Sequence, residues 1–181
     1  MSILLVGAAG SPADAVVTRL VSAGDQVRVV DEEPGRGAGW RALGAHVARG
    51  DPSDYDLIER AAQNVRTIVV LAGKKDDLGP VLDGVIEGAR RATVDRIVLC
   101  AARPAREVVD RLARSGLEYV VLAYGEKRAL LPSSLSKSVS PEDLARAVDA
   151  ADDLGGSPAL DLDLTRRAQW RPLALDPPEG I

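Results

Sequence analysis

The sequence predicts a doubly wound α/β fold, in which a parallel sheet carries helices on both faces. Short apolar runs rich in β-branched residues alternate with longer segments whose apolar residues recur at helical spacing. Most of the short runs are apolar at every position, which is typical of strands buried on both faces of a parallel sheet. The predicted strands cover residues 3–6, 27–30, 46–48, 67–71, 96–100, 119–123 and 159–164.

The segments between these strands are predicted as helices, at residues 12–23, 40–44, 54–63, 79–92, 104–115 and 141–154. The longer ones carry an apolar stripe on one side, such as Leu82, Val85, Ile86 and Ala89 in the fourth. Ser140 and Pro141 supply an N-cap and a proline in the first turn of the last helix. A Gly-rich loop covers residues 34–39.

Composition excludes several functional classes. The net charge is −4, and two Trp, three Tyr and no Phe leave few rings for base stacking, so we expect no nucleic-acid partner. One Cys and one His exclude a disulfide framework and a His/Cys metal site, which leaves only carboxylate-bound Mg²⁺ conceivable. We see no signal peptide and no apolar run long enough to cross a membrane, so we expect a cytoplasmic protein.

A glycine-containing turn joins the first strand to the first helix. Glycines here allow a tight turn and let a pyrophosphate approach the helix N-terminus. The residues expected to bind it are Gly7, Ala9, Gly10, Ser11 and Pro12. We therefore predict a Rossmann-like dinucleotide-binding domain over residues 1–165 and a C-terminal tail, expected to be frayed, over residues 166–181.

A plain βα turn with a capped helix is the alternative. Ser11, Pro12 and Asp14 form their own capping arrangement, and Asp14 places an anion where a ligand phosphate would compete. A carboxylate that points at the turn would lower the affinity for a dinucleotide. One that points outward would only complement the helix dipole.

Asp31 ends the second strand, 21 residues after Gly10. An acid at this place accepts hydrogen bonds from the adenosine ribose and repels a 2′-phosphate. Glu32 and Glu33 add like charge, so NAD is the expected cofactor and NADP is less favoured. Arg36 could partly reverse this preference, and the alternative for the whole segment is a solvated acidic loop.

Several segments, taken in order, resemble those of the atypical short-chain dehydrogenase/reductases, in particular the NmrA-like, NAD(P)H-binding group. The matching segments are residues 7–10 (GAAG), 44–51 (GAHVARGD), 71–73 (LAG), 94–99 (VDRIVL), 112–122 (LARSGLEYVVL) and 140–147 (SPEDLARA). The resemblance implies that Asp51 lies beside the adenine. It also implies that Leu71, Ala72 and Gly73 pass along the adenosine.

The chain departs from this family at the catalytic positions. The family's usual members carry a Ser or Thr after the fifth strand and a Tyr-x-x-x-Lys that serves as general acid/base. Here the strand ends Cys100-Ala101-Ala102, and no Tyr has a Lys four residues later. Tyr124 and Lys127 form the one Tyr/Lys pair that could be recruited for proton transfer. Cys100 ends the fifth strand at the edge where such sheets bind ligands, and we include it among the cofactor-binding candidates. The alternative is that its thiol is buried and inert.

Three functional hypotheses remain open. The first is a dinucleotide-binding sensor, regulator or pseudo-enzyme, because residues 125–139 form only a reduced, irregular substrate lobe. The second is an oxidoreductase or epimerase-like enzyme that acts on a small substrate with NAD(H). The third is a scaffold that has lost its cofactor. The resemblance also implies a homodimer through the helices at 79–92 and 104–115, and Gly84 and Gly88 would permit close helix approach.

Overall fold

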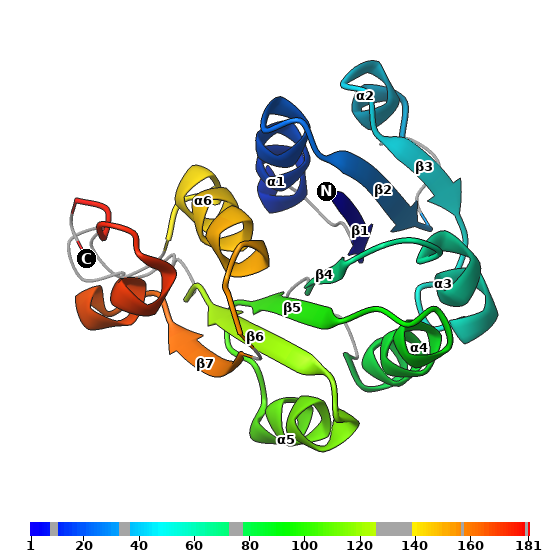
Figure 1. The fold of residues 1–181 in the computed structure, drawn as a ribbon. Helices are drawn as coiled ribbons and strands as arrows, with labels where there is room; N and C mark the ends of the chain where they lie inside the picture. Colours follow the sequence, from blue (N-terminus) through cyan, green and yellow to red (C-terminus); the bar gives the residue numbers. More distant parts are fainter. Residues whose placement is uncertain (8–10, 33–36, 73–77, 126–138, 157, 180) are drawn as a thin grey trace, which may run out of the picture.

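The computed structural model describes residues 1–7, 11–32, 37–72, 78–125, 139–156, 158–179 and 181. Its seven strands are β1 (Ser2–Val6), β2 (Gln26–Asp31), β3 (His46–Arg49), β4 (Thr67–Leu71), β5 (Arg96–Ala101), β6 (Glu118–Ala123) and β7 (Ala159–Asp163). They form one parallel sheet in the order β3-β2-β1-β4-β5-β6-β7 (Figure 1). The predicted doubly wound fold is confirmed.

Helices cover both faces of the sheet (Figure 1). Their bounds are α1 (Ser11–Ser22), α2 (Gly37–Ala42), α3 (Tyr55–Ala61), α4 (Leu78–Arg91), α5 (Arg106–Ser115), α6 (Pro141–Asp152) and the 3-10 helix η1 (Arg167–Leu173). One core cluster packs α1, α2, α6 and η1 against the sheet, and a second packs α3, α4 and α5 against its other face. The central strands β4 and β5 are buried at every position, as the continuous apolar runs predicted.

The short second helix differs from the prediction, because it begins at Gly37 within the expected Gly-rich loop and ends at Ala42. Its fourth residue, Trp40, is buried in the core cluster that contains α1. The burial of this indole stabilises a helix whose glycines have low intrinsic helix propensity. The helix therefore depends on tertiary packing more than on its own sequence.

The expectation of a frayed C-terminal tail is wrong. Residues 167–173 form η1, and Trp170 is 0% exposed in the same core cluster as α6. The Trp170 indole donates a hydrogen bond of 2.8 Å to the carbonyl oxygen of Leu164. A buried indole with a satisfied N–H anchors the segment, so the chain after β7 belongs to the packed fold.

The two glycines of α4 face α3, which they approach closely. A Cβ on Gly84 would lie 2.3 Å from the main-chain oxygen of Ser53, and one on Gly88 would lie 2.7 Å from the Ile58 side chain. The close helix approach that these glycines permit is therefore used within the chain. The sequence argument that linked them to a dimer interface is wrong.

Candidate functional site

The described residues predicted to bind a cofactor gather at the carboxyl edge of the sheet. Gly7 follows β1, Asp31 ends β2, Leu71 ends β4 and Tyr124 follows β6. Because all the strands are parallel, these positions share one edge. The strand order reverses between β1 and β4, and open α/β sheets bind ligands at the carboxyl edge beside such a switch point.

Gly7 fills a position at the switch point that requires glycine. Its φ is +72°, and a Cβ there would lie 2.9 Å from the main-chain oxygen of Leu71. A larger residue would combine an unfavourable backbone conformation with a steric clash. The start of the predicted pyrophosphate turn is thus held directly against the end of β4.

Several predicted site residues lie wholly or partly outside the part of the chain that the structure describes. Ala9, Gly10, Gly73 and Lys127 lie outside the described residues, as does the side chain of Ser11. Pro12 lies in the first turn of α1, as predicted, although the helix begins one residue earlier than expected. The structure thus leaves the pyrophosphate contacts of this turn as a prediction.

The Asp14 carboxylate, which could oppose a phosphate, is engaged by a neighbouring helix. Its Oδ1 accepts a hydrogen bond of 2.8 Å from the indole Nε1 of Trp40. This bond ties α1 to α2, and α2 follows the acidic segment after β2. Sequence reasoning missed Trp40, because nothing in its local pattern indicates a partner 26 residues away.

Asp31 is 8% exposed and lies in register with Arg49 of β3. Side chains alternate between the faces of a strand, which places Asp31 on the same face as Val29 and the α1 core cluster. Arg49 is exposed, so the register brings a cation beside the acid that is expected to hold the ribose. Sequence reasoning missed this residue, because strand register cannot be read from β2 and β3 separately.

Asp51 lies in the loop after β3, next to the end of β2. The Gly50 amide donates to the Asp31 carbonyl, while Asp51 Oδ1 accepts hydrogen bonds from the Ser53 amide at 2.8 Å and the Ser53 hydroxyl at 2.7 Å. These bonds hold the pKa of Asp51 below its usual value. The carboxylate is exposed and stabilises the turn before α3, and its predicted place beside an adenine stays a prediction.

Leu71 and Ala72 are buried at the end of β4, where the Ala72 amide donates to the Cys100 carbonyl at 2.8 Å. The Cys100 side chain is 0% exposed within the core, and desolvation raises the pKa of its thiol. Cys100 thus lies in the paired part of β5 with its side chain in the core, and its contact with a cofactor stays a prediction. The buried thiol is protonated at neutral pH and poorly nucleophilic.

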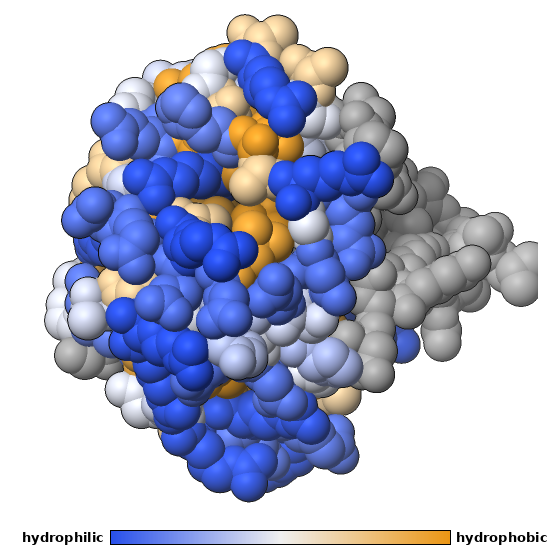
Figure 2. Space-filling view, turned by 90° about the vertical axis from the view of Figure 1, so that its right-hand side faces the viewer, coloured by the Kyte–Doolittle hydropathy of each residue, from blue (hydrophilic) through white to orange (hydrophobic). Residues whose placement is uncertain are grey.

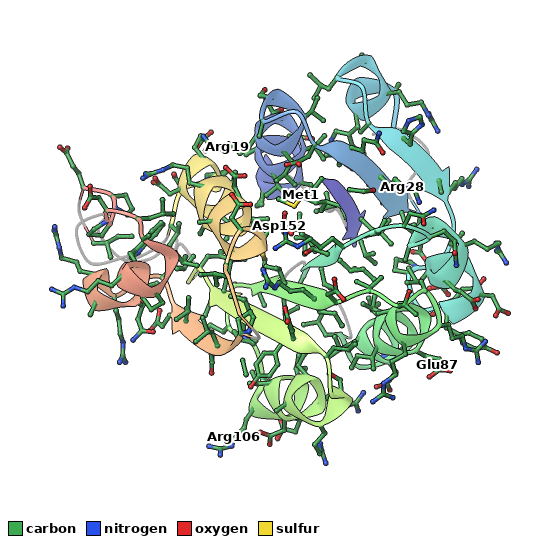
Figure 3. All side chains as sticks on the ribbon, in the orientation of Figure 1. Met1, Arg19, Arg28, Glu87, Arg106 and Asp152 are labelled. Carbon is green, nitrogen blue, oxygen red and sulfur yellow. The ribbon has the colours of Figure 1, made fainter. Side chains whose placement is uncertain are left out.

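Tyr124 reaches across the carboxyl end of β5. Its amide donates to the Ala101 carbonyl at 3.1 Å, and its hydroxyl donates to the Ala72 carbonyl at 3.2 Å. Ala72 follows β4, and β5 lies between β4 and β6, so the side chain spans the end of the central strand. Figure 3 shows the dense packing of side chains along this sheet.

The residues that the structure describes contain no group of three or more His, Cys, Asp or Glu side chains able to hold a metal ion. Within the same residues, no helix is long and apolar enough to cross a membrane.

The comparison with protein families now identifies the class. A family model described as NAD(P)H-binding matches residues 7–134, most of the chain, and the chain belongs to this family. The match begins at Gly7, includes Asp31, Asp51 and the end of β4, and extends past Tyr124. A search of curated proteins finds no significant match.

Solved structures of NAD(P)-dependent reductases and epimerases share the fold. The NADPH-dependent quinone oxidoreductase QOR2 of Escherichia coli, complexed with NADPH, is 20% identical with a TM-score of 0.74, covering 89% of this chain and 68% of that one. The triphenylmethane reductase of Citrobacter sp., complexed with NADP(H), is 17% identical with a TM-score of 0.71, covering 90% and 69%. A nucleoside-diphosphate-sugar epimerase of Staphylococcus aureus is 16% identical with a TM-score of 0.69, covering 89% and 70%. The likeness to these three neighbours is therefore a likeness of fold.

Proposed function

We propose that this protein binds a nicotinamide dinucleotide without carrying out the usual dehydrogenase chemistry and acts as a sensor or regulator. The family match supports the cofactor, and the close approach of Gly7 to Leu71 beside the buried Asp31 supports its placement. The observation that carries the catalytic half of the proposal is Tyr124, whose hydroxyl is bonded to the Ala72 carbonyl after β4. The neighbouring strand β5 ends in Cys100 and Ala101 and offers no Ser or Thr there. A cytoplasmic location stays part of the proposal.

We expect NADH to bind more tightly than NADPH, because Asp31 and Glu32 oppose a 2′-phosphate. Replacing Asp31 with Ala should weaken NADH binding by about 1–2 kcal/mol, the scale of hydrogen bonds to a charged group. Isothermal titration calorimetry of the wild-type protein and the variant with both cofactors measures this difference. Asp161→Ala, which removes an exposed acid from β7, is the matched control and should leave both affinities unchanged.

A second variant tests the same cofactor preference at Arg49. This residue lies in register with Asp31 and could attract the 2′-phosphate of NADPH. Arg49→Ala should weaken NADPH binding and leave NADH binding nearly unchanged. Equal affinities for the two cofactors in the wild-type protein, or a preference for NADPH, would contradict the assignment of NAD.

We expect negligible NADH oxidation with aldehydes, ketones or sugar nucleotides, even where the cofactor binds. Removing a positioned acid/base typically costs about 10²–10⁴-fold in rate, and this chain has no Tyr-x-x-x-Lys to supply one. Absorbance at the NADH band, followed over hours at high protein concentration, tests this prediction.

An oxidoreductase or epimerase-like enzyme is the second candidate. The solved structures named above favour it, and Tyr124 at the ligand-binding edge could supply a proton. This alternative requires turnover that collapses on Tyr124→Phe or Lys127→Ala. Such turnover would also identify a small-molecule substrate.

A homodimer through α4 and α5 is also part of the proposal, and it now rests on the family resemblance. Exposed residues of these helices include Asp83, Arg91, Arg106 and Asp110, which form ion pairs within the chain. The side of the molecule that carries β3 and α3 is largely hydrophilic (Figure 2). Static light scattering at tens of micromolar should give twice the chain mass, and the mass of a monomer would remove the dimer.

A further inference from the structure

Tyr124 lies over the carboxyl end of β5 and connects the ends of β6 and β4. The side chain starts after β6 and ends at the Ala72 carbonyl, 3.2 Å from its hydroxyl. The intervening strand is β5, whose last residues are Cys100 and Ala101. The phenol ring therefore covers the carboxyl end of β5.

The ring also lies on the sheet face that the ligand would use. Leu71, Cys100 and Leu122 are register partners in the α1/α6 core cluster, and Tyr124 packs against that cluster. Gly7 follows β1 toward α1, and Asp31 shares the same face. The Tyr124 ring and the predicted cofactor residues are therefore on one side of the sheet.

A doubly wound sheet has two mononucleotide-binding halves, one on each side of its switch point. Here β1, β2 and β3 form the half that contains Asp31, which the proposed function assigns to the adenosine. The other half consists of β4, β5 and β6, so the nicotinamide nucleoside would lie over their carboxyl ends. Tyr124 bridges these same ends.

We infer that Tyr124 is a specificity-determining residue that covers the nicotinamide half of the site. Ligands that end at the diphosphate, such as ADP, bind with the Tyr124 ring in place. A complete dinucleotide has to break the hydrogen bond between Tyr124 and Ala72 and displace the ring. This inference rests on the proposed dinucleotide site and adds a ligand class and a control residue to it.

Binding measurements with NAD and ADP test the cover directly. Calorimetry should show that wild-type protein binds NAD no more tightly than ADP. Tyr124→Ala should lower the Kd for NAD about tenfold, equivalent to about 1.4 kcal/mol, and leave the Kd for ADP unchanged. Tyr124→Phe, which keeps the ring and loses the hydroxyl, should give a smaller gain of the same kind.

Tyr119→Ala is the matched control, because Tyr119 is also half-buried but lies within β6 and packs against the opposite core cluster. It should leave the ratio of the two affinities at its wild-type value. Weaker NAD binding in Tyr124→Ala, or an unchanged ratio, would overturn the inference. If the wild-type protein binds neither ligand, the proposed function is refuted. The position of the Tyr124 ring is then tested by the thiol measurement described next.

Cys100, the one cysteine of the chain, reports on the cover without any ligand. Its thiol is buried in the core cluster against which Tyr124 packs, so the wild-type protein should react slowly with 5,5′-dithiobis(2-nitrobenzoate) under native conditions. Tyr124→Ala should raise that rate about tenfold, whereas Tyr119→Ala at matched stability should not. Equal rates in the two variants would contradict a cover at this position.

Discussion

Replacing Trp170 with Ala is expected to lower the free energy of unfolding by about 3–5 kcal/mol, the usual cost of truncating a buried Trp. The indole is 0% exposed and packs in the core cluster that contains α6. Its loss leaves a cavity and removes the hydrogen bond to the Leu164 carbonyl. Urea denaturation followed by circular dichroism measures the change.

Arg171→Ala is the matched control, because this neighbouring residue of η1 is exposed. It should change the free energy of unfolding by no more than about 0.5 kcal/mol, as surface substitutions usually do. A similarly small change for Trp170→Ala would mean that the C-terminal segment does not contribute to the core in solution.

Replacing Arg96 with Leu is expected to cost about 3–5 kcal/mol, because it leaves several main-chain carbonyl oxygens without their charged donor. Arg96 is 2% exposed and donates to the carbonyl oxygens of Ala151, Asp152 and Leu154 at 2.9, 2.6 and 2.7 Å. It also pairs with Glu118 at 2.9 Å. These contacts cap the C-terminus of α6 and join it to β5 and β6, where a cation complements the helix dipole.

Arg106→Leu provides the control, because the Arg106 side chain is 91% exposed and its ion pair with Asp110 spans 3.9 Å. Figure 3 shows Arg106 on α5 at the periphery, whereas Asp152 lies at the end of α6 near the middle of the molecule. The control should cost no more than about 1 kcal/mol, the range of surface ion pairs. An equally small cost for Arg96→Leu, measured by the same denaturation, would contradict the capping role.

The sequence predicted the strands well, because strands buried on both faces leave continuous apolar runs that need no partner to recognise. Thr67–Leu71 is the clearest example, since the predicted and observed bounds agree. The C-terminal segment was missed because Trp170 stands among Arg166, Arg167 and Arg171. A short 3-10 helix has no amphipathic repeat long enough to predict, so only tertiary packing reveals its buried side.

The candidate site likewise contains residues that the local sequence predicts and residues that only the tertiary structure reveals. Gly7 and Asp31 could be predicted because their roles depend on the position of a residue at the end of a strand. The bond between Trp40 and Asp14, the register of Arg49 and the reach of Tyr124 to Ala72 could not. Each depends on how segments far apart in the sequence pack together.

A calorimetric titration of the wild-type chain with NADH, paired with Asp31→Ala, tests the central claim of a dinucleotide site at the carboxyl edge most directly. We predict saturable binding at one site per chain, weakened about 5–30-fold by the substitution, which corresponds to about 1–2 kcal/mol. Absence of saturable binding to the folded wild-type protein would contradict the claim. Binding that Asp31→Ala leaves unchanged would place the cofactor elsewhere on the molecule.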